Sequence, residues 1–146
     1  MVSLIVSGHG QLAPGLLSAA EMIFGTNDTI KAVPFKKEEG LEDLKAHFEE
    51  ALQSFEPNSE VLFLIDLFGG SPYNAAVSLA YGQDNLDVVT GVSLPMVLEA
   101  LANAPMMSLK ELTKHLQTVN QDSFKVFSLE AAKLAQVQED EEEDEL

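Results

Sequence analysis

The chain has 146 residues, of which 46% are hydrophobic, and this is enough for one domain with a substantial core. It contains no cysteine, which excludes disulfides, thiolate chemistry and cysteine-based metal sites. The formal net charge is −16, and such acidity argues against nucleic acid or an anionic membrane as a ligand and favours a basic partner.

All basic side chains other than histidine are lysines, so a phosphate group could not be held by a guanidinium fork. Lysines, hydroxyls, backbone N–H groups and helix N-termini remain for that purpose. Met1 leads straight into an apolar segment without a basic region before it, which predicts that there is no secretory signal. No apolar run approaches the ~20 residues that a membrane span needs, so a soluble, cytoplasmic protein is expected.

Apolar periodicity predicts strands that alternate with helices along the chain. The first strand begins at Val2 and ends in Gly8-His9-Gly10. Further strands are expected at 29–33, 61–65 and 86–90. Helices are expected at 11–24, 41–55, 72–81, about 95–101 and 108–119. In the third of these, Ser71 is the expected N-cap and Pro72 the expected first residue.

The C-terminal part of the chain has a different composition. Residues 124–127, with the sequence FKVF, form a candidate short strand without a hairpin partner, and residues 128–138 have weak helical character. Residues 139–145 are all acidic, so 139–146 is expected to be disordered because it lacks an apolar segment to bury. We therefore expect one folded domain over 1–127 and an extension with a disordered acidic tail over 128–146.

The alternation predicts an α/β fold with an open, mostly parallel sheet and helices on both faces. A flavodoxin-like strand order, 2-1-3-4, places strands 1 and 3 side by side. His9 follows the first strand and Asp66 follows the third. Ligands of open α/β sheets bind outside the carboxyl ends of the strands, so this order brings both side chains into one candidate site.

His9 is the candidate reacting residue, and Asp66 is the candidate residue that orients it. Each has a plain alternative, because His9 could be an ordinary loop histidine and Asp66 an ordinary turn aspartate. Their position at two neighbouring strand ends favours the functional interpretation. Gly69 and Gly70 could form a tight turn or a phosphate-binding loop, and Ser71 could contact phosphate besides capping a helix.

The rest of the sequence limits what His9 can do chemically. His47 and His115 lie in unrelated helices beside lysines and are interpreted as surface residues, so no metal site is expected. The nucleophile elbow G-x-S-x-G of serine hydrolases is absent. A nucleophilic histidine remains, in which one ring nitrogen attacks phosphorus while the other donates to a carboxylate that fixes the tautomer.

Three segments together resemble the EIIA component of the mannose-family sugar phosphotransferase system. They are SGHG at 7–10, LIDLFGGSPYNAA at 64–76 and GVSLPM at 91–96, and the resemblance covers about residues 1–127. It implies a cytoplasmic phosphocarrier with the α/β fold described above and without a cofactor.

The resemblance also implies roles for individual residues. His9 would accept a phosphoryl group from the phosphocarrier HPr and pass it to EIIB, which phosphorylates a sugar that enters through the membrane components EIIC and EIID. Asp66 would orient His9, and Ser71, with Gly69 and Gly70, would line the phosphate site. Members of the family are homodimers that exchange a C-terminal strand, which corresponds here to residues 124–127.

Three alternatives remain open at this point. A histidine phosphatase or phosphoglycerate mutase also has a nucleophilic histidine after its first strand, but it needs an arginine where this chain has Gly8. A related phosphocarrier feeds dihydroxyacetone kinase, although the FGGSP segment at 68–72 fits the sugar branch better. A flavodoxin-like binding module is the non-enzymatic alternative, and a yellow purified protein would favour it.

Overall fold

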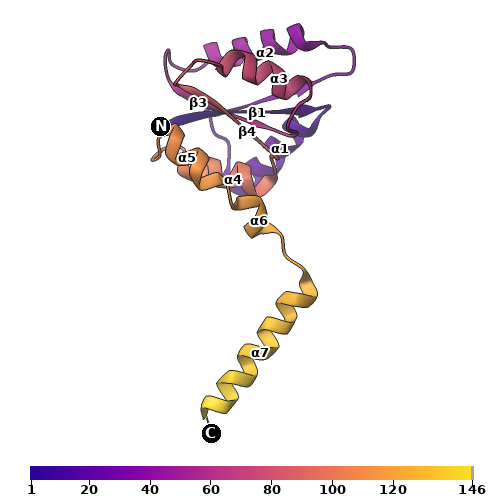
Figure 1. Cartoon of the computed structure of the whole chain (residues 1–146), viewed down its shortest axis with the longest axis vertical. Helices are drawn as coiled ribbons and strands as arrows, with labels where there is room; N and C mark the ends of the chain where they lie inside the picture. The colour runs from indigo at the N-terminus through magenta and orange to yellow at the C-terminus, as the bar shows by residue number, and fades with distance from the viewer. Residues whose placement is uncertain (146) are drawn as a thin grey trace.

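Four parallel strands form one sheet at the centre of the computed structural model, which describes residues 1–145 (Figure 1). The strands are β1 (Val2–His9), β2 (Ile30–Phe35), β3 (Glu60–Ile65) and β4 (Leu86–Thr90). The helices are α1 (Leu12–Phe24), α2 (Leu41–Gln53), α3 (Gly70–Ala80), α4 (Leu94–Asn103), α5 (Leu109–Leu116), α6 (Val119–Ser123) and α7 (Phe127–Glu145).

The sheet has the strand order β2-β1-β3-β4, and all neighbouring strands are parallel. This confirms the flavodoxin-like order expected from the sequence. β1 lies between β2 and β3, with Ser7 opposite Val33 on one side and Ile65 on the other. The carboxyl ends of the three strands therefore lie side by side at one edge of the sheet, where the candidate residues are found.

Helices cover both faces of the sheet and leave its two cores separated by the strands. Figure 1 shows α2 and α3 on one side and α1, α4 and α5 on the other. Alternate residues of β1 point into the two cores: Leu4 and Val6 pack with the α1, α4 and α5 side chains, whereas Ile5 packs with those of α2 and α3. The central strands are consequently buried on both faces, which is why they consist of nearly continuous apolar runs.

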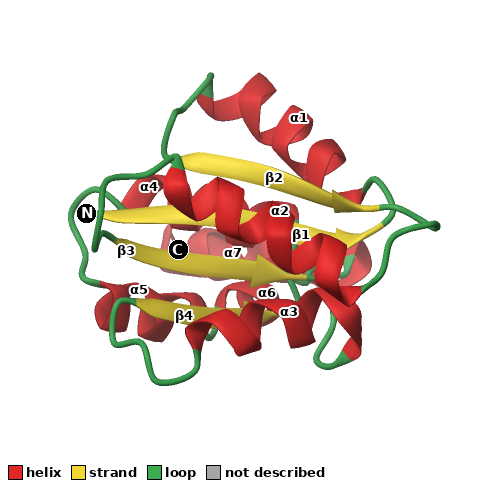
Figure 2. Ribbon diagram, turned by 90° about the horizontal axis from the view of Figure 1, so that it is seen from above, coloured by secondary structure: helices red, strands yellow, loops and turns green. Residues whose placement is uncertain are grey.

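β2 is longer than expected, because it continues through Pro34 to Phe35. The strand expected from the sequence ends at residue 33, one residue before Pro34, and proline lacks the N–H that a hydrogen-bonded ladder uses. β2 is an edge strand (Figure 2), and an edge is where a sheet tolerates the missing N–H. The extension matters for the site because it carries Phe35 up to His9, its register partner in β1.

The C-terminal expectations are corrected by the structure. Residues 124–126 have no regular structure, and Phe127 begins α7, so no strand is formed at 124–127. A strand needs a free edge beside it, and none adjoins this segment within the single chain. Residues 139–145, expected to be disordered, continue α7 to Glu145; the preceding part of the helix is rich in alanine, leucine and glutamine, and five of these seven residues are glutamate, all of which are good helix formers. Residue 146 lies outside the described residues.

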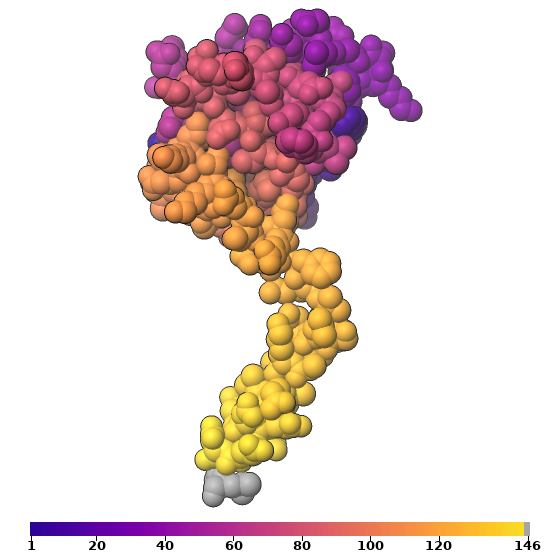
Figure 3. Space-filling view, viewed as in Figure 1, coloured from indigo at the N-terminus to yellow at the C-terminus, as the bar shows by residue number. Residues whose placement is uncertain are grey.

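α7 extends away from the rest of the molecule (Figures 1 and 3). Phe127 is 85% exposed and Leu134 65% exposed, so the helix carries apolar side chains that the described part of the chain does not cover. No helix within residues 1–145 combines the length and the apolar character needed to cross a bilayer.

Candidate functional site

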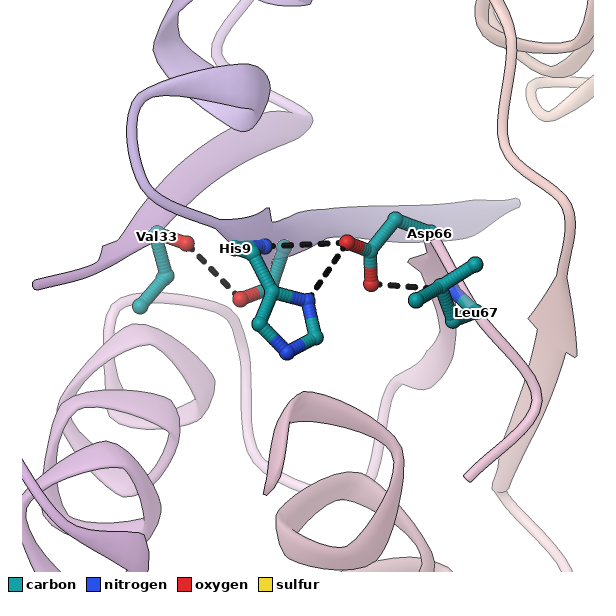
Figure 4. A network of polar contacts seen from close by, with 5 residues as sticks. His9, Val33, Asp66 and Leu67 are labelled. Carbon is teal, nitrogen blue, oxygen red and sulfur yellow. Dashed lines mark hydrogen bonds and ion pairs between the residues drawn. The ribbon is translucent and has the colours of Figure 1, made fainter. Parts of the chain in front are cut away.

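The sheet order brings His9 and Asp66 into direct contact at the carboxyl edge (Figure 4). His9 is the last residue of β1, and Asp66 directly follows β3, the neighbouring strand. The ring atom Nδ1 of His9 lies 2.8 Å from Oδ2 of Asp66. The pairing expected from the sequence is thus formed by the parallel register of two central strands rather than by proximity along the chain.

Asp66 is held in place from several directions. Its Oδ2 also accepts a hydrogen bond from the backbone N–H of His9 at 3.0 Å, and its Oδ1 accepts one from the N–H of Leu67 at 2.9 Å. Gly8 leaves room for the carboxylate, because a Cβ atom there would lie 2.8 Å from the Asp66 Cγ. The side chain is only 11% exposed, so it forms a fixed acceptor for the imidazole.

Electrostatics keep this carboxylate ionised. Partial burial acts to raise the pKa of Asp66, but the hydrogen bonds from the backbone and ring of His9 and from the N–H of Leu67 outweigh it and lower the pKa below its usual range. An ionised Asp66 can only accept hydrogen bonds, so Nδ1 of His9 carries the proton in the neutral imidazole. The lone pair then lies on Nε2, which Figure 4 shows on the side of the ring away from Asp66.

β2 supports the other flank of His9. The aromatic ring of Phe35 meets the imidazole edge-on, with 5.9 Å between ring centroids and an interplanar angle of 75°. The backbone of Gly10 is joined to that of Phe35 by hydrogen bonds of 2.8 Å and 3.3 Å. Two residues before His9, the buried Ser7 hydroxyl donates to the Val33 carbonyl at 2.7 Å. His9 itself remains 50% exposed, so its free nitrogen is accessible from solvent.

The N-terminus of α3 lies beside the free nitrogen. The helix begins at Gly70 with Gly69 as its N-cap, so Ser71 is the second helical residue rather than the expected cap. Gly69 and Gly70 have φ angles of 89° and 81°, which favour glycine, and so a two-glycine turn opens the helix where the sequence analysis had placed a serine cap. A Cβ atom on Gly70 would lie 3.7 Å from Nε2 of His9, so the helix start adjoins the imidazole. Ser71 is half-buried in the same turn.

The two remaining histidines are not part of the His9–Asp66 contact and are paired with glutamates. His47 Nε2 is 2.5 Å from Glu39 Oε2, and His115 Nε2 is 2.9 Å from Glu99 Oε2. Both are partly exposed, as expected, but their partners were not anticipated because each comes from another element. Within residues 1–145, no group of three or more His, Asp or Glu side chains is arranged to hold a metal ion.

Sequence reasoning missed Phe35 and Gly8. Phe35 carries no polar group, and its contact with His9 depends on the extension of β2 past a proline. Gly8 was noted only as part of the motif, although its lack of a side chain admits the Asp66 carboxylate. The glycines on either side of His9 were the one signal in the sequence that another group approaches the backbone closely there.

The chain is similar in sequence to known proteins over most of its length. The family model "PTS system fructose IIA component" matches residues 3–117. The fructose-specific EIIA component of the phosphotransferase system from Bacillus subtilis is 41% identical over 146 residues, which is the full length of both chains.

Solved structures show the same fold. A phosphotransferase system EIIA component from Streptococcus agalactiae superimposes with a TM-score of 0.80 at 26% identity, over 88% of this chain and 99% of that one. The mannose/sorbose-specific IIA subunit from Enterococcus faecalis gives a TM-score of 0.77 at 31% identity, over 85% and 92% of the two chains. The chain therefore belongs to the mannose-family EIIA components of the sugar phosphotransferase system.

Proposed function

We propose that this protein is a cytoplasmic phosphocarrier in which His9 accepts a phosphoryl group from phospho-HPr and donates it to EIIB. The observation that carries the proposal is the 2.8 Å bond between Nδ1 of His9 and Asp66, which leaves Nε2 free on a half-exposed ring. The Nε2 lone pair attacks phosphorus as the bond to the donor nitrogen breaks, and the phosphoryl group becomes bonded to Nε2. Transfer to EIIB repeats this exchange with His9 as the leaving group.

Asp66 supports both directions of transfer through its charge. Phosphorylation of Nε2 places positive charge on the imidazole while Nδ1 keeps its proton. An ionised carboxylate at hydrogen-bond distance stabilises that cation and holds the ring in one orientation. Phosphoryl transfer has a loose transition state that depends chiefly on positioning and electrostatics, and a fixed acceptor on a neighbouring strand supplies both.

The phosphoryl oxygens would be held by the start of α3. In a chain without arginine, the free N–H groups of the first helical turn and the Ser71 hydroxyl are the available donors. The partial positive charge of a helix N-terminus favours a phosphate dianion. Gly70 leaves room for it, because a Cβ atom there would lie 3.7 Å from Nε2, and Gly69 supplies the turn that opens the helix.

Apolar side chains surround this site and would form its docking surface. Phe68 is 81% exposed and Leu67 59% exposed, and the Phe68 ring packs on Tyr73 with 4.8 Å between centroids. An exposed apolar rim around a small reacting group suits successive protein partners. Without residues 139–145 the chain still has 17 acidic residues against 8 lysines, so a basic face on the donor would be attracted to it.

We also propose that the protein acts as a homodimer joined through residues 124–127. Phe124 is 74% exposed and Phe127 85% exposed, which leaves two aromatic rings uncovered in the single chain. The β4 edge of a second copy offers a place for them, because Val88, Val89 and Thr90 line a pocket beside that strand. No proline interrupts β4, whereas the β2 edge contains Pro34.

The sugar branch of the system is favoured over a role in supplying dihydroxyacetone kinase. The compared proteins from B. subtilis and E. faecalis are described as fructose-specific and mannose/sorbose-specific. A histidine phosphatase or mutase is not favoured, since the arginines on which that chemistry depends are absent from the sequence.

The test is reconstitution with labelled phosphoenolpyruvate, Enzyme I and HPr. Label should be retained on this protein as an acid-labile, base-stable phosphohistidine, and it should be lost when EIIB and a sugar-transporting membrane fraction are added. A protein that acquires no label under conditions in which HPr becomes phosphorylated would contradict the proposal.

A further inference from the structure

The loop between β2 and α2 is fastened more firmly than its surface position requires. Its turn is closed twice: the Glu39 N–H donates to the Lys36 carbonyl at 3.1 Å, and the Lys36 N–H donates to Glu39 Oε1 at 2.9 Å. The second carboxylate oxygen of Glu39 lies 2.5 Å from Nε2 of His47 on α2. Hydrogen bonds from the Lys36 N–H and His47 lower the pKa of Glu39, so the carboxylate remains an acceptor for both partners.

Glu39 is also less exposed than its neighbours in the loop. Its side chain is 15% exposed, whereas Lys37 and Glu38, the two central residues of the turn, are exposed. The carboxylate therefore lies in the groove between β2 and α2, a pocket that Lys36 and His47 also line. It connects one end of the loop to a helix that is anchored by the core side chains Leu44 and Phe48.

The fastened turn directly follows the residue that contacts His9. Phe35 precedes Lys36 in sequence, its backbone is joined to that of Gly10 by two hydrogen bonds, and its ring lies edge-on to the imidazole. Asp66 fixes the position of one ring atom but leaves the imidazole plane free to tilt about that hydrogen bond. A second contact on the other flank is needed to restrict that tilt, and Phe35 provides it.

We propose that Glu39 is a positioning residue for His9, which acts by clamping the β2–α2 turn and so holding Phe35 against the imidazole. This inference rests on the proposed phosphoryl transfer at His9. Glu39 forms its hydrogen bonds with Lys36 and His47 rather than with His9 or Asp66, so it acts through the turn and Phe35. The clamp orients Nε2 toward the start of α3, where the phosphoryl oxygens are held.

The test compares Glu39→Ala with Glu39→Gln and with a matched control. Glu39→Ala removes both contacts, whereas Glu39→Gln keeps an acceptor oxygen for the Lys36 N–H. Glu38→Ala removes the same charge from the same loop and has no role in the clamp. NMR spectra of the His9 ring protons report the Phe35 contact directly through its ring current, and Phe35→Leu defines the spectrum without that contact.

We expect Glu39→Ala to move the His9 ring signals toward those of the Phe35→Leu variant, while Glu39→Gln and Glu38→Ala remain close to wild type. In transfer assays with phospho-HPr, Glu39→Ala should lower kcat roughly tenfold with little change in KM, because misplacement of the ring affects the reacting geometry more than docking. Glu39→Gln should restore most of the rate. Thermal melts of the Glu38 and Glu39 variants should be close to wild type, since both residues lie outside the core.

The inference is overturned if Glu39→Ala leaves the His9 ring signals and kcat unchanged, or if Glu38→Ala changes them equally. The NMR comparison needs no phosphoryl donor. A wild-type protein that accepts no phosphate would therefore overturn the proposed function, while the ring signals of the Glu39 variants would still decide whether the clamp exists.

Discussion

The two ends of the chain are both rich in apolar side chains, yet their surroundings are opposite. Val2, Leu4, Ile5 and Val6 in β1 are fully buried, whereas Phe124 is 74% exposed, Phe127 85% and Leu134 65%. β1 has a partner strand on each side and helices on both faces, so it is complete within one chain. α7 has no such neighbours within the described residues, and the proposed dimer is the arrangement that would cover its apolar side chains.

The carboxylates at the two ends of the chain also differ in their electrostatic environment. At the carboxyl edge of β1, each oxygen of Asp66 accepts at least one hydrogen bond within its own domain. In α7 the acidic residues 139–145 follow one another at the C-terminal end of a helix, where negative charge is unfavourable. The Asp66 carboxylate is therefore held at a fixed position beside His9, whereas the acidic side chains of residues 139–144 are exposed to solvent.

The largest effect is expected for a substitution of His9, at the carboxyl end of β1. His9→Gln should abolish phosphorylation by phospho-HPr, because it removes the nucleophilic Nε2 without removing core side chains. His47→Gln and His115→Gln are the controls and should still be labelled, since their imidazoles are paired with Glu39 and Glu99 rather than with Asp66. Labelling that survives His9→Gln, or that maps to another histidine by peptide analysis, would show that the site is misassigned.

Asp66→Asn separates geometry from charge at the same edge. The side chain keeps its size but can offer an N–H donor to Nδ1, which favours the tautomer with the proton on Nε2. We expect phosphorylation to slow by roughly 10²-fold, ~3 kcal/mol at the barrier. Rapid-mixing assays with phospho-HPr measure the rate, and a thermal melt checks the fold. A variant that reacts at the wild-type rate would reduce Asp66 to a turn residue.

Truncation after Ser123 tests the proposed dimer contact in the C-terminal part of the chain. It removes the linker and α7 but leaves α6 intact, and we expect a dimer to become a monomer with the same α/β core. Light scattering measures the mass, and circular dichroism checks the helix content that remains. The double variant Phe124→Ser with Phe127→Ser is a milder form of the same test. A truncated protein that stays a dimer would move the interface elsewhere.

Acid should reduce the contribution of Asp66 to the free energy of unfolding. Its pKa in the folded chain is lowered from the ordinary value of 3.8, so its contribution to the free energy of unfolding is present above pH 3.8 and is lost as the pH falls through the lower folded value. Urea unfolding from about pH 2 to 5 should show the wild type losing its advantage over Asp66→Asn across that range. A difference that is independent of pH would contradict this origin.

The smallest effect is expected at the far end of α7. Deletion of residues 139–146 should change the rate of transfer from phospho-HPr by less than about tenfold, which corresponds to ~1.4 kcal/mol, because α7 extends away from the part of the molecule that holds His9 (Figure 1). Replacing Glu139, Asp140 and Glu141 with glutamine removes part of the charge and keeps the full chain length. A greater loss on deletion would show that the acidic segment takes part in recognition of the donor.

The sequence by itself determined the elements whose information is local. Hydrophobic periodicity over a few residues was enough to predict strand β1 and the boundaries of β4 at 86 and 90. The glycines that flank His9 likewise indicated a turn, because glycine has greater backbone freedom. The local pattern and the general handedness of β-α-β connections narrowed the possible strand orders but did not select one. The order 2-1-3-4 was favoured because it brings His9 and Asp66, which follow two strands, to the same edge of the sheet.

Only the tertiary structure decided the features that depend on contacts between distant segments. Phe35 reaches His9 because β2 continues past Pro34 at a sheet edge, and Glu39 meets His47 because the loop lies along α2. The helix start at Gly70 replaced the expected Ser71 cap for the same reason, since the backbone there approaches the imidazole. Residues 124–127 have strand-forming side chains, but a strand forms only beside a free edge, and within one chain that segment has none.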